Sequence, residues 1–263
     1  MHEIADIACN FTSDRFNNDI DEVINKAINN KVVKFALICS QLSDIDKLLK
    51  IYHQYSKNMF FTIGVHPHHA NEINDDYLKK LRELVTSYNP HAIGETGLDF
   101  FRNLSTYEEQ IFAFEEQIKI SIDANKPLFL HQRDSHKEFI KILKKYSSSI
   151  NKCVVHCFTG TQEQLDIYLE LGCYIGITGW VCDEKRNIEL RKTIKNIPIE
   201  RLMIETDCPY LIPKNLDEKP KNNRNEPNNL NHIVKEISKL MEIDEEILRE
   251  KTFKNTIRFF DAK

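Results

Sequence analysis

The sequence has no long apolar run, no excess of positive charge and no dense framework of cysteines. Its 263 residues carry a formal net charge of -4, which argues against bulk electrostatic binding to long duplex nucleic acid. No stretch approaches the roughly 18 apolar residues that a membrane-spanning helix needs. The first residues show no basic segment followed by an apolar one. We therefore expect no membrane partner and a cytoplasmic location.

The seven cysteines are an odd number and include no C-x-x-C pair. They are expected to be reduced and mostly buried thiols, as in cytosolic proteins. Two of them, Cys157 and Cys208, directly follow His156 and Asp207. Adjacent strand residues point to opposite faces, so we do not expect these two thiols to share a metal with their neighbours.

Eight short apolar, β-branched or aromatic segments alternate with segments of helical periodicity. The expected strands are Ile4 to Cys9, Val32 to Cys39, Phe60 to His66, Ala92 to Leu98, Pro127 to His131, Lys152 to His156, Cys173 to Thr178 and Leu202 to Asp207. The spacing of their starts suits βα units with variable loops. Eight such units in a chain of this length predict a (β/α)8 TIM barrel, with residues 1–263 as a single domain.

The segments between the strands carry helix signals. Apolar side chains from Ile20 to Ile28 recur at helical spacing. Ser43, Ser105-Thr106 with Glu108-Glu109, and Asp134 are expected near helix starts as N-caps or first-turn residues. The one long irregular stretch, Pro209 to Asn229, is expected to be a surface loop, and loops after barrel strands also line active sites.

Five strands end in a side chain that can bind a metal or move a proton, namely His66, Glu95, His131, His156 and Asp207. In TIM barrels the C-terminal strand ends build the active site. One carboxylate and two imidazoles, Glu95, His131 and His156, suit Zn²⁺, Mn²⁺ or a similar ion and leave positions for water and substrate. Asp207 can ligate the metal or accept the proton of its bound water. We therefore predict a catalytic metal centre at this rim.

Other residues beside these strand ends are expected to assist. The glycines on both sides of Glu95 predict a tight turn that leaves the carboxylate unshielded. His66 is expected to bind a substrate phosphate or steady a leaving group, and His68 and His69 to face solvent. Arg133 is a candidate phosphate contact, with a surface ion pair as the alternative.

Several strings resemble the signatures of the TatD family of metal-dependent deoxyribonucleases, a branch of the amidohydrolase-like barrels. They are Gly64-Val-His-Pro-His68, Gly94-Glu-Thr-Gly-Leu-Asp99, His156-Cys-Phe-Thr-Gly160, Gly176-Ile-Thr-Gly-Trp180, Glu205-Thr-Asp-Cys-Pro-Tyr210 and Arg224-Asn-Glu-Pro227. They occur in family order and span nearly the whole chain. The opening string Asp6-Ile-Ala-Cys-Asn-Phe-Thr12 is similar to the branch that gives the family its name.

The resemblance implies a divalent-metal phosphodiesterase that acts as a 3′ to 5′ exonuclease on single-stranded DNA or RNA. The expected ion is Mg²⁺, with Mn²⁺ or Zn²⁺ as alternatives. By motif position, Glu95, His131 and His156 match the family's metal ligands, Asp207 its strand-eight acid, and His66 its substrate-binding histidine. The loop after the eighth strand is expected to track the substrate with four basic residues, Lys214, Lys219, Lys221 and Arg224.

One departure from the family pattern affects the metal count. Most of the wider family carries His-x-His at the end of strand one, where this chain has Ala8-Cys9-Asn10. Neither alanine nor a neutral amide replaces an imidazole. We therefore predict one firm metal site, with a second that is absent or held weakly by Asp6 and Asn10.

Two other functions remain open at this point. The same residues could hydrolyse an ester, as in a D-aminoacyl-tRNA deacylase. The departure at Ala8 and Asn10 also allows a barrel that has lost catalysis and only binds nucleic acid. The sequence does not set the oligomeric state, for which a monomer is the expectation.

Overall fold

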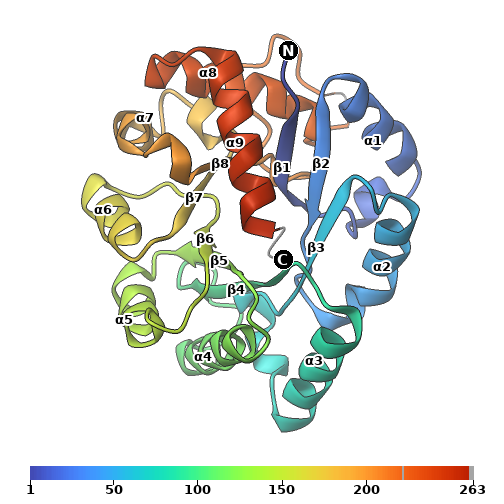
Figure 1. Ribbon diagram of the computed structural model, residues 1–263, viewed down its shortest axis with the longest axis vertical. Coiled ribbons are helices and arrows are strands. Elements are labelled where there is room, and N and C mark those ends of the chain that lie inside the picture. Colours follow the sequence, from blue (N-terminus) through green and yellow to red (C-terminus); the bar gives the residue numbers. More distant parts are fainter. Residues whose placement is uncertain (221, 261–263) are drawn as a thin grey trace.

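The eight strands form one parallel sheet whose order follows the sequence (Figure 1). The computed structural model describes residues 1–220 and 222–260, so Lys221 and the last three residues lie outside the described part. The strands are β1 Ile4–Cys9, β2 Val32–Leu37, β3 Met59–Ile63, β4 Ala92–Asp99, β5 Leu128–Arg133, β6 Cys153–Val155, β7 Tyr174–Ile177 and β8 Leu202–Ile204. A parallel bridge between Cys9 and Cys208 brings the chain after β8 against β1. The predicted (β/α)8 barrel is confirmed.

Helices surround the sheet (Figure 1). They are α1 Ile20–Asn29, α2 Ile45–Gln54, α3 Asp75–Tyr88, α4 Tyr107–Asp123, α5 His136–Tyr146, α6 Gln162–Glu170, α7 Ile188–Thr193, α8 Leu230–Met241 and α9 Glu245–Phe260. Thr106 caps α4 in a reciprocal capping box with Glu109, as predicted. The N-cap positions of α2 and α5 are Asp44 and Ser135, so the predicted caps Ser43 and Asp134 are each wrong by one residue.

The last helix, α9, closes the N-terminal end of the barrel, and the sequence analysis did not predict it. Its final residues Phe259 and Phe260 are buried among side chains of the barrel interior. The Phe260 ring stacks on Phe60 of β3 with ring centroids 5.0 Å apart, and Phe259 meets Tyr174 of β7 at 5.5 Å. Both partners lie at strand starts, so this plug sits opposite the rim where the predicted site residues lie.

All seven cysteines are free, and all but Cys157 are buried, as expected from the sequence. The Sγ atoms of Cys153 and Cys173, on neighbouring strands, lie 3.2 Å apart. In the part of the chain that the structure describes, no helix is both long enough and apolar enough to cross a membrane.

Candidate active site

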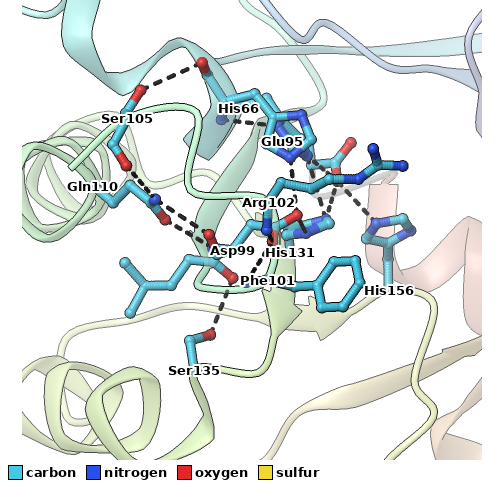
Figure 2. Close-up of polar contacts among 12 residues, drawn as sticks. His66, Glu95, Asp99, Phe101, Arg102, Ser105, Gln110, His131, Ser135 and His156 are labelled. Atoms are coloured by element: carbon cyan, nitrogen blue, oxygen red, sulfur yellow. Dashed lines mark hydrogen bonds and ion pairs between the residues drawn. The ribbon is translucent and has the colours of Figure 1, made fainter. Parts of the chain in front are cut away.

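Four of the predicted side chains meet at the C-terminal end of the barrel, around the carboxylate of Glu95 (Figure 2). Glu95 Oε1 lies 2.8 Å from His131 Nδ1, 2.9 Å from His156 Nε2 and 3.4 Å from His66 Nε2. His66, Glu95 and His131 bring ligand atoms within 4.8 Å of one another and form a group that can hold a metal ion. Four consecutive strands, β3 to β6, thus each deliver one polar side chain to the same point.

Glu95 lies inside β4, so the predicted turn at this position is wrong. Its flanking glycines have positive φ, +140° at Gly94 and +141° at Gly97. A Cβ at Gly94 would lie 2.3 Å from the carbonyl oxygen of Phe129, and one at Gly97 would lie 2.0 Å from that of His131. The glycines are therefore needed because β4 approaches β5 too closely for any side chain.

Asp207 follows β8 at a left-handed residue, with φ +55°, and lies beside Asn10. The Asn10 amide donates hydrogen bonds to Asp207 Oδ1 at 3.0 Å and to the Cys208 carbonyl at 3.1 Å. Burial raises the pKa of the Asp207 carboxyl to about 7, with Glu95 and Glu205 adding to the rise and His156 opposing it. Asp207 can therefore take up a proton near neutral pH.

Glu95 has the opposite electrostatic setting. Burial alone would raise the pKa of its carboxyl, but the close approach of the histidine rings, with His156 contributing most and His131 donating a hydrogen bond, holds that pKa well below its usual range. Glu95 thus stays ionised while Asp207 can be protonated. Environments that push the pKa values of two acids apart mark different chemical roles.

His66 presents a hydrogen-bond donor to the cluster. Its Nδ1 accepts the backbone N–H of His68 at 3.1 Å, and burial lowers the pKa of the ring to about 4, although Glu95 raises it. The neutral ring therefore carries its single proton on Nε2, which faces Glu95 and His131. A protonated Nε2 suits a phosphate oxygen better than a metal ion.

Asp99, at the end of β4, is a site residue that the sequence analysis missed. It is buried, and its Oδ1 accepts the backbone N–H groups of Phe101 and Arg102 at 3.0 and 2.8 Å. Its Oδ2 lies 2.9 Å from His68 Nε2 and 3.3 Å from His131 Nε2. The prediction that His68 faces solvent is therefore wrong. The available signal was that Asp99 closes the same string as Glu95.

Glu205, just after β8, is the second missed residue. It is fully buried, its Oε1 accepts the backbone N–H of Cys157, and its Oε2 lies 3.5 Å from His156 Nδ1. Gly176 makes room for it, since a Cβ there would lie 2.9 Å from Glu205 Oε1. Its position two residues before Asp207 was the available signal. Glu205 thus places a carboxylate beside Nδ1 of the His156 ring, whose Nε2 faces Glu95.

The donor set fits a divalent cation. Both buried ring nitrogens of His156 lack a hydrogen-bond partner among the described residues, although Glu95 lies at 2.9 Å from one of them. Buried polar atoms in native proteins are nearly always satisfied. An ion between Glu95, His131 and His156 would satisfy Nε2 with ligands that proteins commonly use.

Strand one contributes hydrogen bonds at this end of the barrel. Asp6 is fully buried and accepts the backbone N–H groups of Thr206 at 2.9 Å and Ala8 at 3.2 Å, together with the Thr206 hydroxyl. These three donors leave Asp6 little capacity for the weak second ion that the sequence allowed there. Asn10 points its amide at Asp207. Both residues thus join β1 to the segment after β8.

The carboxylate of Asp6 also lies within 4.8 Å of the Cys9 and Cys208 thiols, as a second group of potential metal ligands. Burial raises the pKa of both thiols. A thiol must lose its proton to bind a metal. We therefore interpret this buried group as part of the packing where β1 meets the segment after β8.

Arg133, the predicted phosphate contact, lies at the rim of the barrel. Arg133 is exposed at the end of β5, with its guanidinium 4.0 Å from the centre of the Phe101 ring and no ion pair among the described residues. The exposed Arg102 extends toward the histidine cluster from the loop after β4 (Figure 2). Arg133 and Arg102 therefore leave two cationic groups at the rim.

Arg224, by contrast, is an internal anchor, and its contacts replace the predicted contact with substrate. It is buried and donates to both carboxylate oxygens of Asp19 at 2.8 and 2.7 Å and to Glu226 at 2.9 Å. Of the other basic residues predicted to track the substrate, Lys214 and Lys219 are exposed, and Lys221 lies outside the described residues.

Comparison with known proteins agrees with this arrangement. The family model of TatD-related DNases matches residues 5–261. The 3′-5′ ssDNA/RNA exonuclease TatD of Yersinia pseudotuberculosis is 41% identical over 255 residues, which cover 97% of this chain and 98% of that protein. Its namesake in Edwardsiella piscicida is 40% identical over 257 residues, covering 98% and 99%.

A solved structure gives the same result. The TatD family hydrolase of Entamoeba histolytica matches with a TM-score of 0.89 at 31% identity, over 100% of this chain and 99% of that chain. The family match and the identities to curated relatives each span nearly the full length. The chain therefore belongs to the family of TatD-related DNases.

Proposed function

We propose that this protein is a metal-dependent nuclease that removes nucleotides from the 3′ end of single-stranded DNA or RNA. The observation that carries the proposal is the approach of His131 and His156 to one oxygen of Glu95, at 2.8 and 2.9 Å, with the buried His156 nitrogens left without hydrogen bonds. The names of the relatives, 3′-5′ ssDNA/RNA exonuclease TatD, support the substrate class and the direction.

Glu95, His131 and His156 would hold the ion, with Asp207 as a further ligand or as the neighbouring base. When bound, a divalent ion polarises a non-bridging phosphate oxygen and lowers the pKa of its water. We propose Mg²⁺ as the working ion, and Mn²⁺ and Zn²⁺ also suit this mixture of oxygen and nitrogen ligands. One firm site is proposed, because strand one offers Asn10 and the already hydrogen-bonded Asp6.

The surrounding side chains supply the proton transfer and the hold on the phosphate. Asp207 takes the proton of the attacking water, a role favoured by a carboxyl pKa of about 7. His66 Nε2–H donates a hydrogen bond to a phosphate oxygen, and Arg133 adds a charge-assisted hydrogen bond to the same group. These contacts stabilise the charge that develops on the phosphate as its bond to the leaving oxygen breaks.

The Asp207→Asn variant tests the proposed base. Asparagine keeps the shape of the side chain but cannot accept the water proton, so turnover of a 5′-labelled single strand should fall by at least about 100-fold. The matched control is Asp134→Asn, an exposed acid after β5 that shares the left-handed backbone, with φ +53°. The control should retain activity. Turnover by Asp207→Asn after removal and restoration of metal would contradict the role.

No described contact favours either alternative function. Ester hydrolysis on a D-aminoacyl-tRNA would use the same residues, so purified protein should be given that substrate and the labelled strand in separate reactions. Loss of the aminoacyl group alone would favour the deacylase. Neither metal binding nor turnover with Mg²⁺ or Mn²⁺ would favour a barrel that only binds nucleic acid.

We also propose a cytoplasmic setting. The free thiols support it, since Cys153 and Cys173 hold unbonded sulfur atoms only 3.2 Å apart and thiols persist in reducing compartments. A monomer stays a prediction, which light scattering of the purified protein tests.

A further inference from the structure

A pocket of about 320 Å³ opens beside Asp207, between the loops that follow β1, β7 and β8. Its lining combines aromatic and cationic side chains, chiefly Trp180, Tyr210, Arg15, Arg186 and Lys214. The volume falls in the range of small-molecule sites, roughly 300–1,000 Å³. The backbone N–H of Tyr210 donates to the Asp207 carbonyl at 2.9 Å, so one turn carries both the proposed base and a wall of the pocket.

The aromatic side chains of the pocket have no ring partner. Tyr210 is 52% exposed and Trp180 is half-buried, and neither makes a ring contact with another described residue. The lining is closely packed at Gly179, where a Cβ would lie 2.6 Å from the Leu211 carbonyl oxygen. Two aromatic side chains without ring partners thus line the pocket beside a closely packed part of its wall.

The cations of the pocket outweigh its one acid, Asp183. Arg15 is held in place by hydrogen bonds to the carbonyls of Pro209 at 3.2 Å and Asn223 at 2.5 Å. Asp183 Oδ1 accepts the backbone N–H groups of Lys185 and Arg186, and its Oδ2 lies 3.6 Å from Arg186 Nε. The acid is therefore neutralised locally, which leaves the pocket positive.

The pocket adjoins the turn that carries Asp207, because Pro209 and Tyr210 belong to its lining. Burial raises the pKa of the Tyr210 hydroxyl, the charges of Asp207 and Glu95 raise it further, and Arg15 lowers it. Because Tyr210 follows Asp207 in one turn and donates its backbone N–H to the Asp207 carbonyl, a group bound against the Tyr210 ring would lie next to the turn that carries the proposed base.

We propose that this pocket is a nucleotide subsite, in which Tyr210 and Trp180 stack on the base of one of the two nucleotides that flank the cleaved phosphate. The inference rests on the proposed nuclease function and adds a hold on the base. Aromatic stacking accepts any base, because every base has a π-face. It also gives a protein of net charge -4 an attachment to the strand that does not depend on neutralising many phosphates.

The test combines a protein variant with matched substrates. The strands are a 5′-labelled oligothymidylate and two versions with a single abasic residue, at the 3′-terminal or the adjacent position. Tyr210→Leu should lower kcat/KM on the intact strand by about 5- to 150-fold, the range for loss of one stacked base. Wild-type protein should lose a similar factor on one abasic strand, and Tyr210→Leu should lose nothing more there. Tyr88→Leu, on the exposed α3 tyrosine, is the control and should act as wild type.

The outcomes separate the subsite from the enzyme. The subsite would be overturned if Tyr210→Leu had the kcat/KM of wild type on the intact strand. It would also be overturned if, on both abasic strands, the loss of kcat/KM from the variant multiplied the loss from the missing base. Either result would leave the nuclease function in place. If wild-type protein with metal shortens none of the strands, the proposed function fails instead. If Tyr210→Leu fails to fold, the same comparison is made with Trp180→Leu.

Discussion

Each histidine proposed to bind the metal is flanked by a second carboxylate as well as by Glu95. Asp99 lies 3.3 Å from His131 Nε2, and Glu205 lies 3.5 Å from His156 Nδ1. Outer carboxylates of this kind fix the orientation of a metal-binding imidazole and increase its basicity. At the scale of single residues, the site therefore depends on two acids that would not touch the substrate.

The Glu205→Gln variant tests this support. The amide keeps the volume and an oxygen for the Cys157 N–H but loses the negative charge beside His156, so Mn²⁺ affinity should fall about 10- to 100-fold. Calorimetric titration of the metal-free protein measures it. The control is Glu236→Gln, a buried acid on α8 paired with Arg191 at 2.7 Å. Equal affinity in wild type and Glu205→Gln would show that the charge is not needed.

The sequence was sufficient to predict which residues gather at the rim, because His66, Glu95, His131 and His156 each follow an apolar strand and parallel strands share one end. It was not sufficient for Asp99 and Glu205, whose importance depends on distances between different strands. Arg224 was misassigned for a related reason, since its partner Asp19 is 205 residues away along the chain. The roles of the gathered residues stay predictions until variants are measured.

At the scale of elements, the contact between β4 and β5 sets the position of the site. Gly97 pairs with His131 in the ladder, and its missing side chain brings the backbone of β4 against the carbonyl of His131. Glu95 and His131 are thereby placed on neighbouring strands at hydrogen-bonding distance. The sequence indicated that Gly94 and Gly97 have an unusual backbone conformation. It did not indicate a close contact between strands, because a tight turn and such a contact have the same glycine pattern.

Gly97→Ala should therefore disrupt this contact. The control is Gly172→Ala, which also has positive φ, +77°, but no neighbouring atom within 4 Å of an added Cβ. Gly172→Ala should cost about 1–2 kcal/mol from its backbone conformation alone. Gly97→Ala should cost about 1–3 kcal/mol more, because its methyl group also overlaps the backbone of β5. Urea unfolding of both variants measures the difference, and equal costs would mean that β4 can move away from β5.

Several strands end earlier in the structure than the apolar pattern of the sequence predicts. The prediction for β1 agrees with the structure, whereas the strands predicted to reach His66, His156 and Asp207 stop earlier, at Ile63, Val155 and Ile204. The apolar pattern continues past the last ladder pair, because residues at the rim are buried by loops as well as by strands. From the sequence alone, a buried residue that makes no strand pairing cannot be distinguished from a residue within a strand.

At the scale of the whole molecule, the two ends of the barrel have separate tasks. The rim at the C-terminal strand ends carries the candidate active site, and the opposite end is closed by the phenylalanines of α9. Stability and catalysis should therefore respond to different substitutions.

Phe259→Ala tests this separation. The residue is fully buried, so its truncation should lower the free energy of unfolding by about 3–5 kcal/mol. The kcat/KM of the folded protein should stay unchanged, because the cavity lies at the far end of the strands. Phe112→Ala on α4, where the side chain is 45% exposed, is the control and should shift stability by no more than about 0.5 kcal/mol. A fall in kcat/KM without loss of stability would contradict the separation.

The seam between β1 and the segment after β8 also has a consequence for biosynthesis. Asp6 binds Thr206, Asn10 binds Asp207, and α9 packs against β1. During synthesis β1 therefore acquires these neighbours only after β8 and α9 have been made. Contacts so distant along the chain close slowly, so until then the nascent protein has an unpaired edge on β1 and depends on the cell to keep that edge from other chains.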